Sequence, residues 1–185
     1  MNRLYRTDGW NTRGTEKRLI KDSEVIKVGD WIIDEATGAA NVDAVTEKVF
    51  GLATAIVTAK GISLENNLVD TGALGGTWAS STKQYTAAAD NSTVDGVMVE
   101  FTPVREGDEF IATIDDAKGT TTGSNKKGYR LAILTSDSSK LDESSAATAD
   151  ASTQFMITDP YDDGPTTEVI VKVTARGTDQ FAVAT

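Results

Sequence analysis

Apolar and polar residues alternate along much of the chain with the two-residue period of a β-strand. Residues 97–102 show this most clearly, because Val97, Val99 and Phe101 fall on one face. Further short runs are rich in β-branched and aromatic residues and are separated by turn residues, a pattern typical of strands. These runs are residues 25–28, 31–34, 49–58, 110–115, 129–134, 154–157, 168–174 and 181–183.

Helical periodicity is almost absent, and only residues 64–69 fit a single helical turn. Residues 137–152 are acidic, rich in Ser and Ala and poor in large apolar side chains, which predicts a long surface loop. Roughly eight to ten short strands without a substantial helix predict an all-β fold. We expect an antiparallel β-barrel or β-sandwich with an extended N-terminal arm.

Two short segments of the chain resemble each other. Residues 27–34 (KVGDWIID) and 105–112 (REGDEFIA) both place Gly-Asp before an aromatic residue and aliphatic residues. Gly-Asp between β-rich runs indicates a turn, because glycine adopts backbone angles that strain other residues. We interpret the two segments as one turn-to-strand element used twice. A glycine within another run, Gly51, predicts a bulge or a close approach to its backbone.

Charge is distributed unevenly along the chain. Residues 1–21 hold six basic and two acidic residues, whereas the other 164 residues hold 12 basic and 26 acidic ones. This contrast predicts a basic N-terminal arm at residues 1–21 that docks on an acidic partner, followed by a single β-domain at residues 22–185. Aromatic and basic side chains are typical of interfaces. The residues expected to contact the partner are Arg3, Tyr5, Arg6, Trp10, Arg13, Lys17 and Arg18.

The chain contains neither cysteine nor histidine. This excludes disulfides, zinc or iron sites built on Cys or His, and catalysis with histidine as the general base. The formal net charge of −10 argues against nucleic acid as a partner. No apolar stretch reaches the roughly 18 residues that predict a membrane span. We expect no cofactor, no nucleic acid and no membrane partner.

Chemistry that uses only oxygen groups survives this exclusion. The segment 159–165 holds Asp159, Asp162 and Asp163, which could supply calcium ligands, but it lacks the spacing of a calcium-binding loop. We interpret it as an ordinary hairpin loop. Adjacent carboxylates at residues 34–35 and 115–116 would serve a glycosidase only if two faced each other across a cleft, and we interpret them as solvated surface.

Two tryptophans invite different interpretations. Trp31 precedes two isoleucines and is expected in the core. Trp78 lies in a stretch rich in Gly, Ser and Thr, where it would serve either a subunit contact or a platform for a sugar.

Several short motifs resemble those of head decoration, or cement, proteins of tailed bacteriophages. Such proteins pair a strand that starts with Gly-Asp and hydrophobic residues with a later strand of the Val-aromatic-Gly-hydrophobic-Ala kind. The matching segments are residues 28–34 (VGDWIID), 37–38 (TG) and 49–53 (VFGLA), then 107–110 (GDEF), 128–131 (GYRL), 155–157 (FMI) and 169–173 (VIVKV). The resemblance covers residues 22–183.

This resemblance implies a small β-barrel or β-sandwich protein that is not an enzyme. It implies a homotrimer that binds the major capsid protein on the outside of the virion and bridges its subunits, after assembly in the host cytoplasm. Proteins of this kind commonly reach their neighbours with an N-terminal arm, a role that residues 3–21 would suit. Two alternatives stay open: a tail-tube or baseplate component, and a carbohydrate-binding or adhesin module that uses Trp78.

Overall fold

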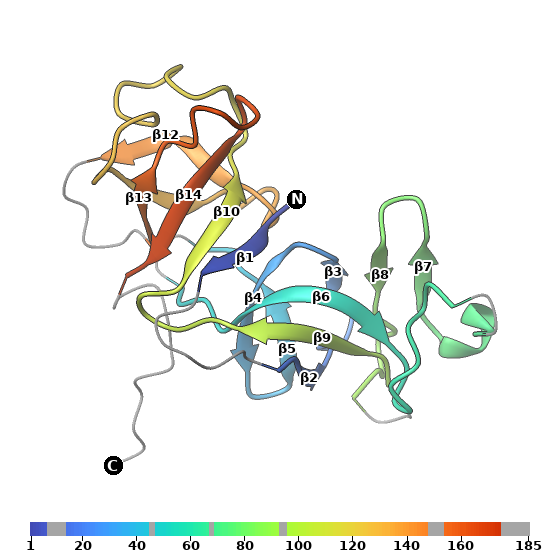
Figure 1. Cartoon of the computed structure of the whole chain (residues 1–185). Helices are drawn as coiled ribbons and strands as arrows, with labels where there is room; N and C mark the ends of the chain where they lie inside the picture. The colour runs from blue at the N-terminus through green and yellow to red at the C-terminus, as the bar shows by residue number, and fades with distance from the viewer. Residues whose placement is uncertain (7–13, 45–46, 67–68, 93–95, 148–153, 175–185) are drawn as a thin grey trace, which may run out of the picture. The chain divides into compact units, whose positions relative to one another are not determined.

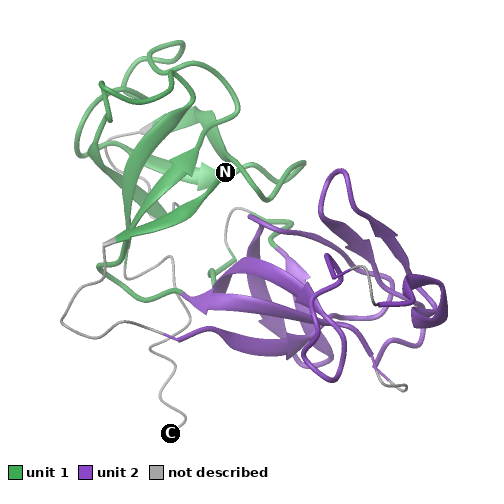
Figure 2. Ribbon diagram, turned by 45° about the vertical axis from the view of Figure 1, so that its right-hand side comes forward, with its two compact units in different colours: residues 1–12, 42–50, 104–185 green, residues 13–41, 51–103 purple. Residues whose placement is uncertain are grey.

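The computed structural model describes residues 1–6, 14–44, 47–66, 69–92, 96–147 and 154–174. Antiparallel strands dominate this part of the chain, with one short 3-10 helix, η1 (Thr71–Leu74) (Figure 1). The all-β, antiparallel fold predicted from the alternation is therefore confirmed. The chain forms two compact units: unit 1 comprises residues 1–12, 42–50 and 104–185, and unit 2 comprises residues 13–41 and 51–103 (Figure 2).

Unit 1 contains a six-stranded sheet in the order β1-β10-β14-β13-β11-β12. Its strands are β1 (Arg3–Arg6), β10 (Glu109–Thr113), β11 (Arg130–Ile133), β12 (Leu141–Ala147), β13 (Phe155–Asp159) and β14 (Glu168–Val173). A parallel bridge between Ile114 and Leu141 joins the end of β10 to β12, so the sheet curls toward a barrel. Side chains with no exposed surface fill its interior, among them Phe110, Leu131, Phe155, Ile157 and Val171.

Unit 2 contains a five-stranded sheet in the order β2-β9-β6-β4-β5 and a three-stranded sheet in the order β3-β8-β7. Its strands are β2 (Glu16–Leu19), β3 (Val25–Lys27), β4 (Trp31–Glu35), β5 (Gly38–Asn41), β6 (Gly51–Val57), β7 (Thr77–Ala79), β8 (Gln84–Thr86) and β9 (Met98–Pro103). A parallel bridge between Ile20 and Ala39 joins the two end strands of the larger sheet, which curls in the same manner.

Alternation and glycine placement explain the core of unit 2. Along β9 every second side chain is buried, as the sequence predicts, and these include Val99 and Phe101. Trp31 has no exposed surface and packs in the core, which confirms its expected role. A Cβ atom added at Gly51 would lie 2.3 Å from the Phe101 ring, so the predicted close approach to this glycine is real.

The first Gly-Asp segment forms a β-turn at the start of β4. The Asp30 N–H donates to Lys27 O (3.0 Å), and the Lys27 N–H donates to the Asp30 carboxylate (2.6 Å). Gly29 has a φ of 100°, which favours glycine. Two further backbone bonds join Gly29 and Asp30 to Ala53 of β6 (both 2.9 Å), so the turn is fixed to the neighbouring strand.

The second Gly-Asp segment forms the same turn at the start of β10. The Asp108 N–H donates to Arg105 O (3.1 Å), the Arg105 N–H donates to the Asp108 carboxylate (2.9 Å), and Gly107 has a φ of 90°. Gly107 and Asp108 bond in turn to Val173 of β14 (3.1 and 3.0 Å). The prediction of one turn-to-strand element used twice is confirmed, with one copy in each unit.

The N-terminal segment differs from the predicted arm. Its described residues form β1, which pairs with β10 in unit 1, and β2, which pairs with β9 in unit 2. A separate arm at residues 1–21 is thus not confirmed, and the chain divides into two compact units where one β-domain at residues 22–185 was expected. Backbone groups of both strands find partners within these sheets, which gives the segment a structural role.

One local prediction was wrong. Residues 141–147 of the expected 137–152 loop form β12. Two buried residues anchor this strand, Leu141 and Glu143, and Glu143 is only 2 % exposed. A strand with a single large apolar residue gives little alternation to detect. Of the single helical turn predicted at residues 64–69, residues 64–66 form a turn in which the Asn66 N–H donates to Ser63 O (3.0 Å), and residues 67–68 lie outside the described residues. The 3-10 helix η1 follows, and the Asp70 carboxylate accepts a hydrogen bond there from the Gly72 N–H (3.1 Å).

Candidate functional site

Basic side chains of the N-terminal segment form ion pairs with acidic residues of the units to which they belong. In unit 1, Arg3 pairs with Glu168. In unit 2, the pairs are Lys17 with Glu100 (4.0 Å), Arg18 with Asp34 (2.6 Å) and Lys21 with Glu35 (2.7 Å). The opposite charges that predicted docking on another molecule therefore also attach this segment to its own acidic sheets.

Arg3 makes the most extensive of these contacts. Its two terminal nitrogens donate to the two carboxylate oxygens of Glu168 (3.1 and 3.2 Å), the forked geometry that suits guanidinium. The hydrogen bonds to Glu168 raise the pKa of Arg3 above its ordinary value, against the opposing effect of desolvation. The Glu168 carboxylate is largely buried. This pair links β1 to β14 through side chains, while backbone pairing joins β1 to β10.

Asn2 anchors the start of the chain. It is only 4 % exposed, and its carbonyl oxygen accepts from the Thr113 N–H (2.7 Å) while its amide donates to Ser139 O (2.8 Å). The Asn2 side chain thus links the end of β10 to the segment before β12 through hydrogen bonds to the backbone of both. Nothing in the sequence pattern singles out this asparagine.

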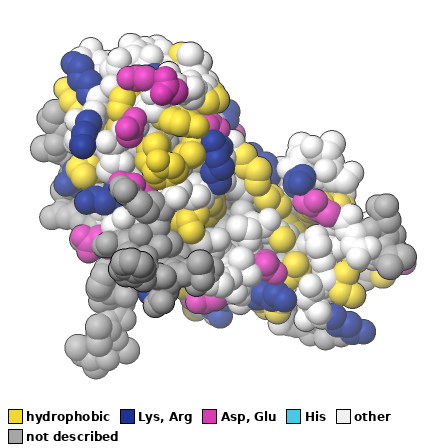
Figure 3. Space-filling model, viewed as in Figure 1, with side chains coloured by type: hydrophobic (Ala, Val, Ile, Leu, Met, Phe, Trp, Pro, Cys, Tyr) yellow, Lys and Arg dark blue, Asp and Glu magenta, His cyan; other side chains and the backbone are white. Residues whose placement is uncertain are grey.

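Apolar exposure concentrates at the same end of the chain. The exposed large hydrophobic residues of the described chain are Met1, Leu4, Tyr5 and Ile62, at 66, 36, 54 and 45 %. The register of β1 against β10 shifts between Leu4 and Arg6, which leaves Tyr5 as the extra residue of a bulge. Figure 3 shows apolar side chains gathered over the part of unit 1 where β1 and β10 lie.

The remaining predicted interface residues divide into two groups. Arg6 lies on β1 with its backbone opposite Glu109. Trp10 and Arg13 lie outside the described residues. The structure therefore brings Arg3, Tyr5 and Arg6 together on one edge strand, and it places Lys17 and Arg18 on β2 of the other unit.

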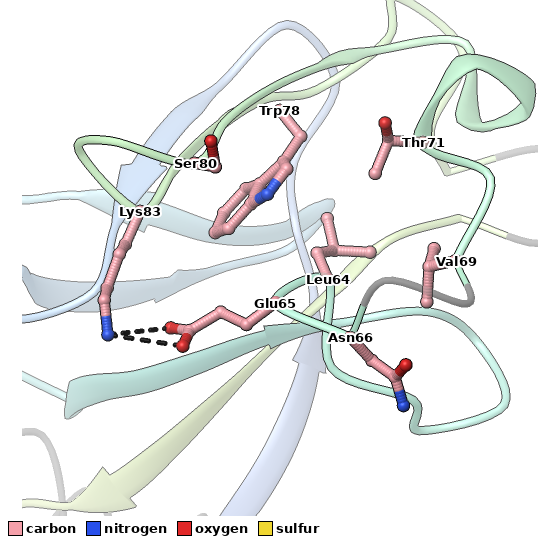
Figure 4. A pocket seen from close by; sticks show the side chains of 8 residues that line it. All are labelled: Leu64, Glu65, Asn66, Val69, Thr71, Trp78, Ser80 and Lys83. Carbon is pink, nitrogen blue, oxygen red and sulfur yellow. Dashed lines mark hydrogen bonds and ion pairs between the residues drawn. The ribbon is translucent and has the colours of Figure 1, made fainter.

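A pocket of about 460 Å³ lies in unit 2 beside Trp78 (Figure 4). Half-buried Trp78 forms one wall, and Leu64 and Val69 provide aliphatic surface across from the indole. An ion pair between Lys83 and Glu65 (3.1 Å) closes one end. The full lining is Leu64, Glu65, Asn66, Val69, Thr71, Trp78, Ser80 and Lys83.

Local folding explains how these side chains meet. Trp78 of β7 pairs with Tyr85 of β8, and the turn between these strands carries Lys83. The Tyr85 hydroxyl donates to Leu74 O (3.2 Å), which fastens η1 to this hairpin, and burial raises the pKa of Tyr85. Lys83 has a φ of 52°, a left-handed conformation in which lysine is uncommon.

A second pocket of about 420 Å³ is also lined by Val69. Its lining includes exposed Ile62 together with Leu74 and the backbone region after β6. Val69 lines both pockets, so the two hollows share one wall.

The acidic loop at residues 159–165 is held by protein groups. The Tyr161 N–H donates to the Asp159 carboxylate (2.7 Å), and Lys118 Nζ donates to the carbonyl oxygens of Pro160 and Tyr161 (2.9 and 2.7 Å). Within the described ranges, no three acidic, His or Cys side chains are grouped so that they could hold a metal ion. The hairpin interpretation of this loop is the one that its contacts support.

Glu143 is a buried carboxylate of unit 1. Desolvation acts to raise its pKa, but hydrogen bonds from Ser124 and Thr121 outweigh this effect and lower the pKa below its ordinary value. Both donors belong to the loop that precedes β11, so Glu143 fastens that loop to β12. Its role is structural.

Sequence reasoning found Trp78 but missed the residues that complete its pocket. Glu65 and Lys83 are separated by 18 positions and belong to different loops, and no local pattern links them. Among the described residues, no helix is long and apolar enough to cross a membrane. No protein-family model, curated protein or solved structure matches this chain.

Proposed function

We propose that this chain is a non-enzymatic virion structural protein that binds the outer surface of a phage capsid and stabilises it by bridging major capsid subunits. It acts as a homotrimer on the virion exterior. Two lines of argument support this: the motif resemblance at residues 28–34, 49–53 and 107–110, and the all-β fold that the resemblance implies.

The observation that carries the proposal is the exposed apolar surface of β1. Soluble proteins rarely gather exposed large hydrophobic residues without an interaction to serve, and here Leu4 and Tyr5 are adjacent. A bulge directs Tyr5 away from regular pairing. Tyrosine is enriched where partners bury an interface.

The outer edge of β1 adds a second means of contact. In the described sheet, β1 is an end strand and pairs with β10. The outer edge of such a strand offers backbone groups to a strand of another protein, which then extends the sheet. A capsid subunit that added a strand here would also cover Leu4 and Tyr5.

The basic residues take a different role from the apolar ones in this proposal. Arg3, Lys17 and Arg18 hold β1 and β2 in their own units through ion pairs. These ion pairs hold the two strands in place, and Tyr5 and Trp10 then contact the capsid as the apolar anchors. Bridging capsid subunits stabilises the shell through binding free energy and needs no reactive group or cofactor.

The test uses the full-length protein, because deletion of residues 1–21 would remove β1, β2 and the Asn2 anchor. Light scattering gives the mass of the purified protein, and co-sedimentation with capsids gives occupancy. The double variant Tyr5→Ala/Trp10→Ala should lose most occupancy, whereas Ile62→Ala, a matched change at an exposed apolar residue of unit 2, should keep it.

A trimer whose binding depends on Tyr5 and Trp10 would support the proposal. A hexamer would favour a tail-tube or baseplate ring, and a monomer that ignores capsids would overturn it. Circular dichroism and thermal melting of both variants establish that the folded β-structure is retained.

A further inference from the structure

The Trp78 pocket combines one aromatic face with polar groups at its margin. Leu64 is only 3 % exposed and lines the buried side of the pocket, whereas the Trp78 indole lines the pocket and is partly exposed. No hydrogen bond joins the Trp78 indole N–H to another residue within the part of the chain that the structure describes. The indole therefore offers a ligand both a flat apolar face and a donor.

The charges of the lining cancel. Glu65 and Lys83 are its ionisable residues, and they face each other at 3.1 to 3.3 Å. Both side chains remain about half exposed, so they keep donor and acceptor capacity toward a third group. A charged ligand would have to compete with this pair and, if anionic, would also meet a protein of net charge −10.

The size of the pocket suits a small molecule. Its volume of about 460 Å³ falls within the roughly 300 to 1,000 Å³ typical of small-molecule sites. Polar and apolar groups share the lining, with the Ser80 hydroxyl beside Trp78 and the Thr71 hydroxyl across the pocket from it. An amphipathic ligand, with one apolar face and polar groups at its rim, would match this lining.

Lys83 is the last residue of the turn between β7 and β8. Its φ of 52° is one that Gly or Asn adopts more readily, yet the chain places a long cationic side chain there. That side chain extends to the pocket and meets Glu65 (Figure 4).

We propose that this pocket binds a neutral pyranose ring, independently of the capsid contact made by unit 1. The C–H face of the ring stacks on Trp78, because partially positive hydrogens meet the negative face of the indole. Ring hydroxyls donate to the Glu65 carboxylate and accept from Lys83 Nζ. A virion protein with such a site would hold saccharides on its surface.

The test observes the indole N–H signals of ¹⁵N-labelled full-length protein by NMR, since the chain has only three tryptophans. The probes are methyl α-glucopyranoside, methyl β-galactopyranoside, N-acetylglucosamine, maltose and cellobiose. Each is added to a concentration on the order of 10 mM, which fills a site with a Kd of about 1 mM. We expect a saturable shift of the Trp78 signal, while the signal of buried Trp31 stays in place.

Three variants locate the binding. Trp78→Ala should abolish binding, so that the saccharides no longer shift any other signal in the spectrum. Thr77→Ala changes an exposed neighbour on the same strand and should preserve binding. Lys83→Gly should weaken it at least several-fold. This variant keeps its fold because glycine accepts the φ of 52°.

The outcomes separate this inference from the capsid proposal, because no capsid is present. If none of the saccharides moves the Trp78 signal, the inference is overturned. It is equally overturned if Trp78→Ala binds as the parent does, or if glucose 6-phosphate binds more tightly than the neutral sugars. A shift produced only by an aromatic peptide would assign the pocket to protein docking instead.

Discussion

Asp30 and Asp108 occupy equivalent positions in the two units, and each carboxylate accepts a hydrogen bond from the backbone N–H three residues earlier. Both are almost completely buried, at 2 and 0 % exposure. A buried carboxylate is costly unless backbone donors satisfy it, and a turn closed in this way supplies them. The same local chemistry thus starts β4 in unit 2 and β10 in unit 1.

Replacement of either aspartate by alanine should destabilise the unit that contains it. The change leaves the N–H of Lys27 or Arg105 without its carboxylate acceptor, a loss of about 1 to 3 kcal/mol. Urea denaturation gives the free energy of unfolding. Hydrogen exchange should show faster exchange at the Ala53 amide in Asp30→Ala and at the Val173 amide in Asp108→Ala, since these amides bond to the turns.

Asp163→Ala provides the matched control, because this aspartate is exposed in the 159–165 loop. Its free energy of unfolding should stay within about 0.5 kcal/mol of the parent value. Equal effects of all three substitutions would show that the turn carboxylates have no special role.

The Gly-Asp turns were predictable because their cause is local. Each turn spans four consecutive residues, and its Gly-Asp pair, with glycine at a positive φ, can be recognised in the sequence. The alternation of apolar and polar residues in β9 likewise identifies which face of that strand is buried. Trp31 and Gly51 were interpreted correctly for the same reason: each lies within a strongly patterned strand.

Features that depend on distant partners could not be predicted. Glu143 lies in a Ser- and Ala-rich strand, and only its contact with Ser124 explains why a carboxylate is buried there. Asn2 looks like an ordinary residue until Thr113 and Ser139 are placed beside it. The Trp78 pocket likewise depends on Glu65 and Lys83, which come from separate loops.

Glu143 should make part of the stability of unit 1 depend on pH. Its pKa is lower in the folded protein than in the unfolded chain, so its contribution is present above the unfolded value of about 4.3. The contribution is lost as the pH falls through the folded pKa. In Glu143→Gln the charge-assisted bonds from Ser124 and Thr121 are weakened, and we expect a loss of about 1 kcal/mol at pH 7.

Urea denaturation at pH 7 and below pH 4 measures this difference. The gap between parent and Glu143→Gln should narrow at the lower pH, where the parent carboxyl becomes protonated. Glu106→Gln changes an exposed residue, and its free energy of unfolding should match that of the parent at both pH values. A gap that stays constant with pH would contradict the assigned role.

Asn2 should matter for stability far more than its terminal position suggests. Asn2→Ala removes the acceptor of the Thr113 N–H and the donor to Ser139 O, and both partners lie in a partly buried setting. We expect a loss of about 1 to 3 kcal/mol in the free energy of unfolding. The exposed Asn125→Ala serves as control and should change little. Equal melting temperatures of the two variants would remove the anchor role from Asn2.

Arg3 and Tyr5 are two residues apart on β1, and their substitutions should affect different properties. Arg3→Met breaks the forked pair with Glu168, and because the arginine side chain is 49 % exposed we expect a loss of only about 1 kcal/mol in stability. Tyr5→Ala removes an exposed ring that makes no ion pair and should leave the free energy of unfolding within about 0.5 kcal/mol.

Under the proposed function, capsid occupancy should rank these two variants in the opposite order from their stability. At a protein concentration near the Kd of the parent, Arg3→Met should reach the occupancy of the parent, since the Arg3 charge is already engaged by Glu168, whereas Tyr5→Ala should reach a lower occupancy. Added salt weakens exposed charge contacts more than apolar ones, so occupancy of the parent should also change little between low and moderate ionic strength. Steep salt dependence, together with loss of binding in Arg3→Met, would show that the basic residues and not the apolar edge of β1 hold the capsid.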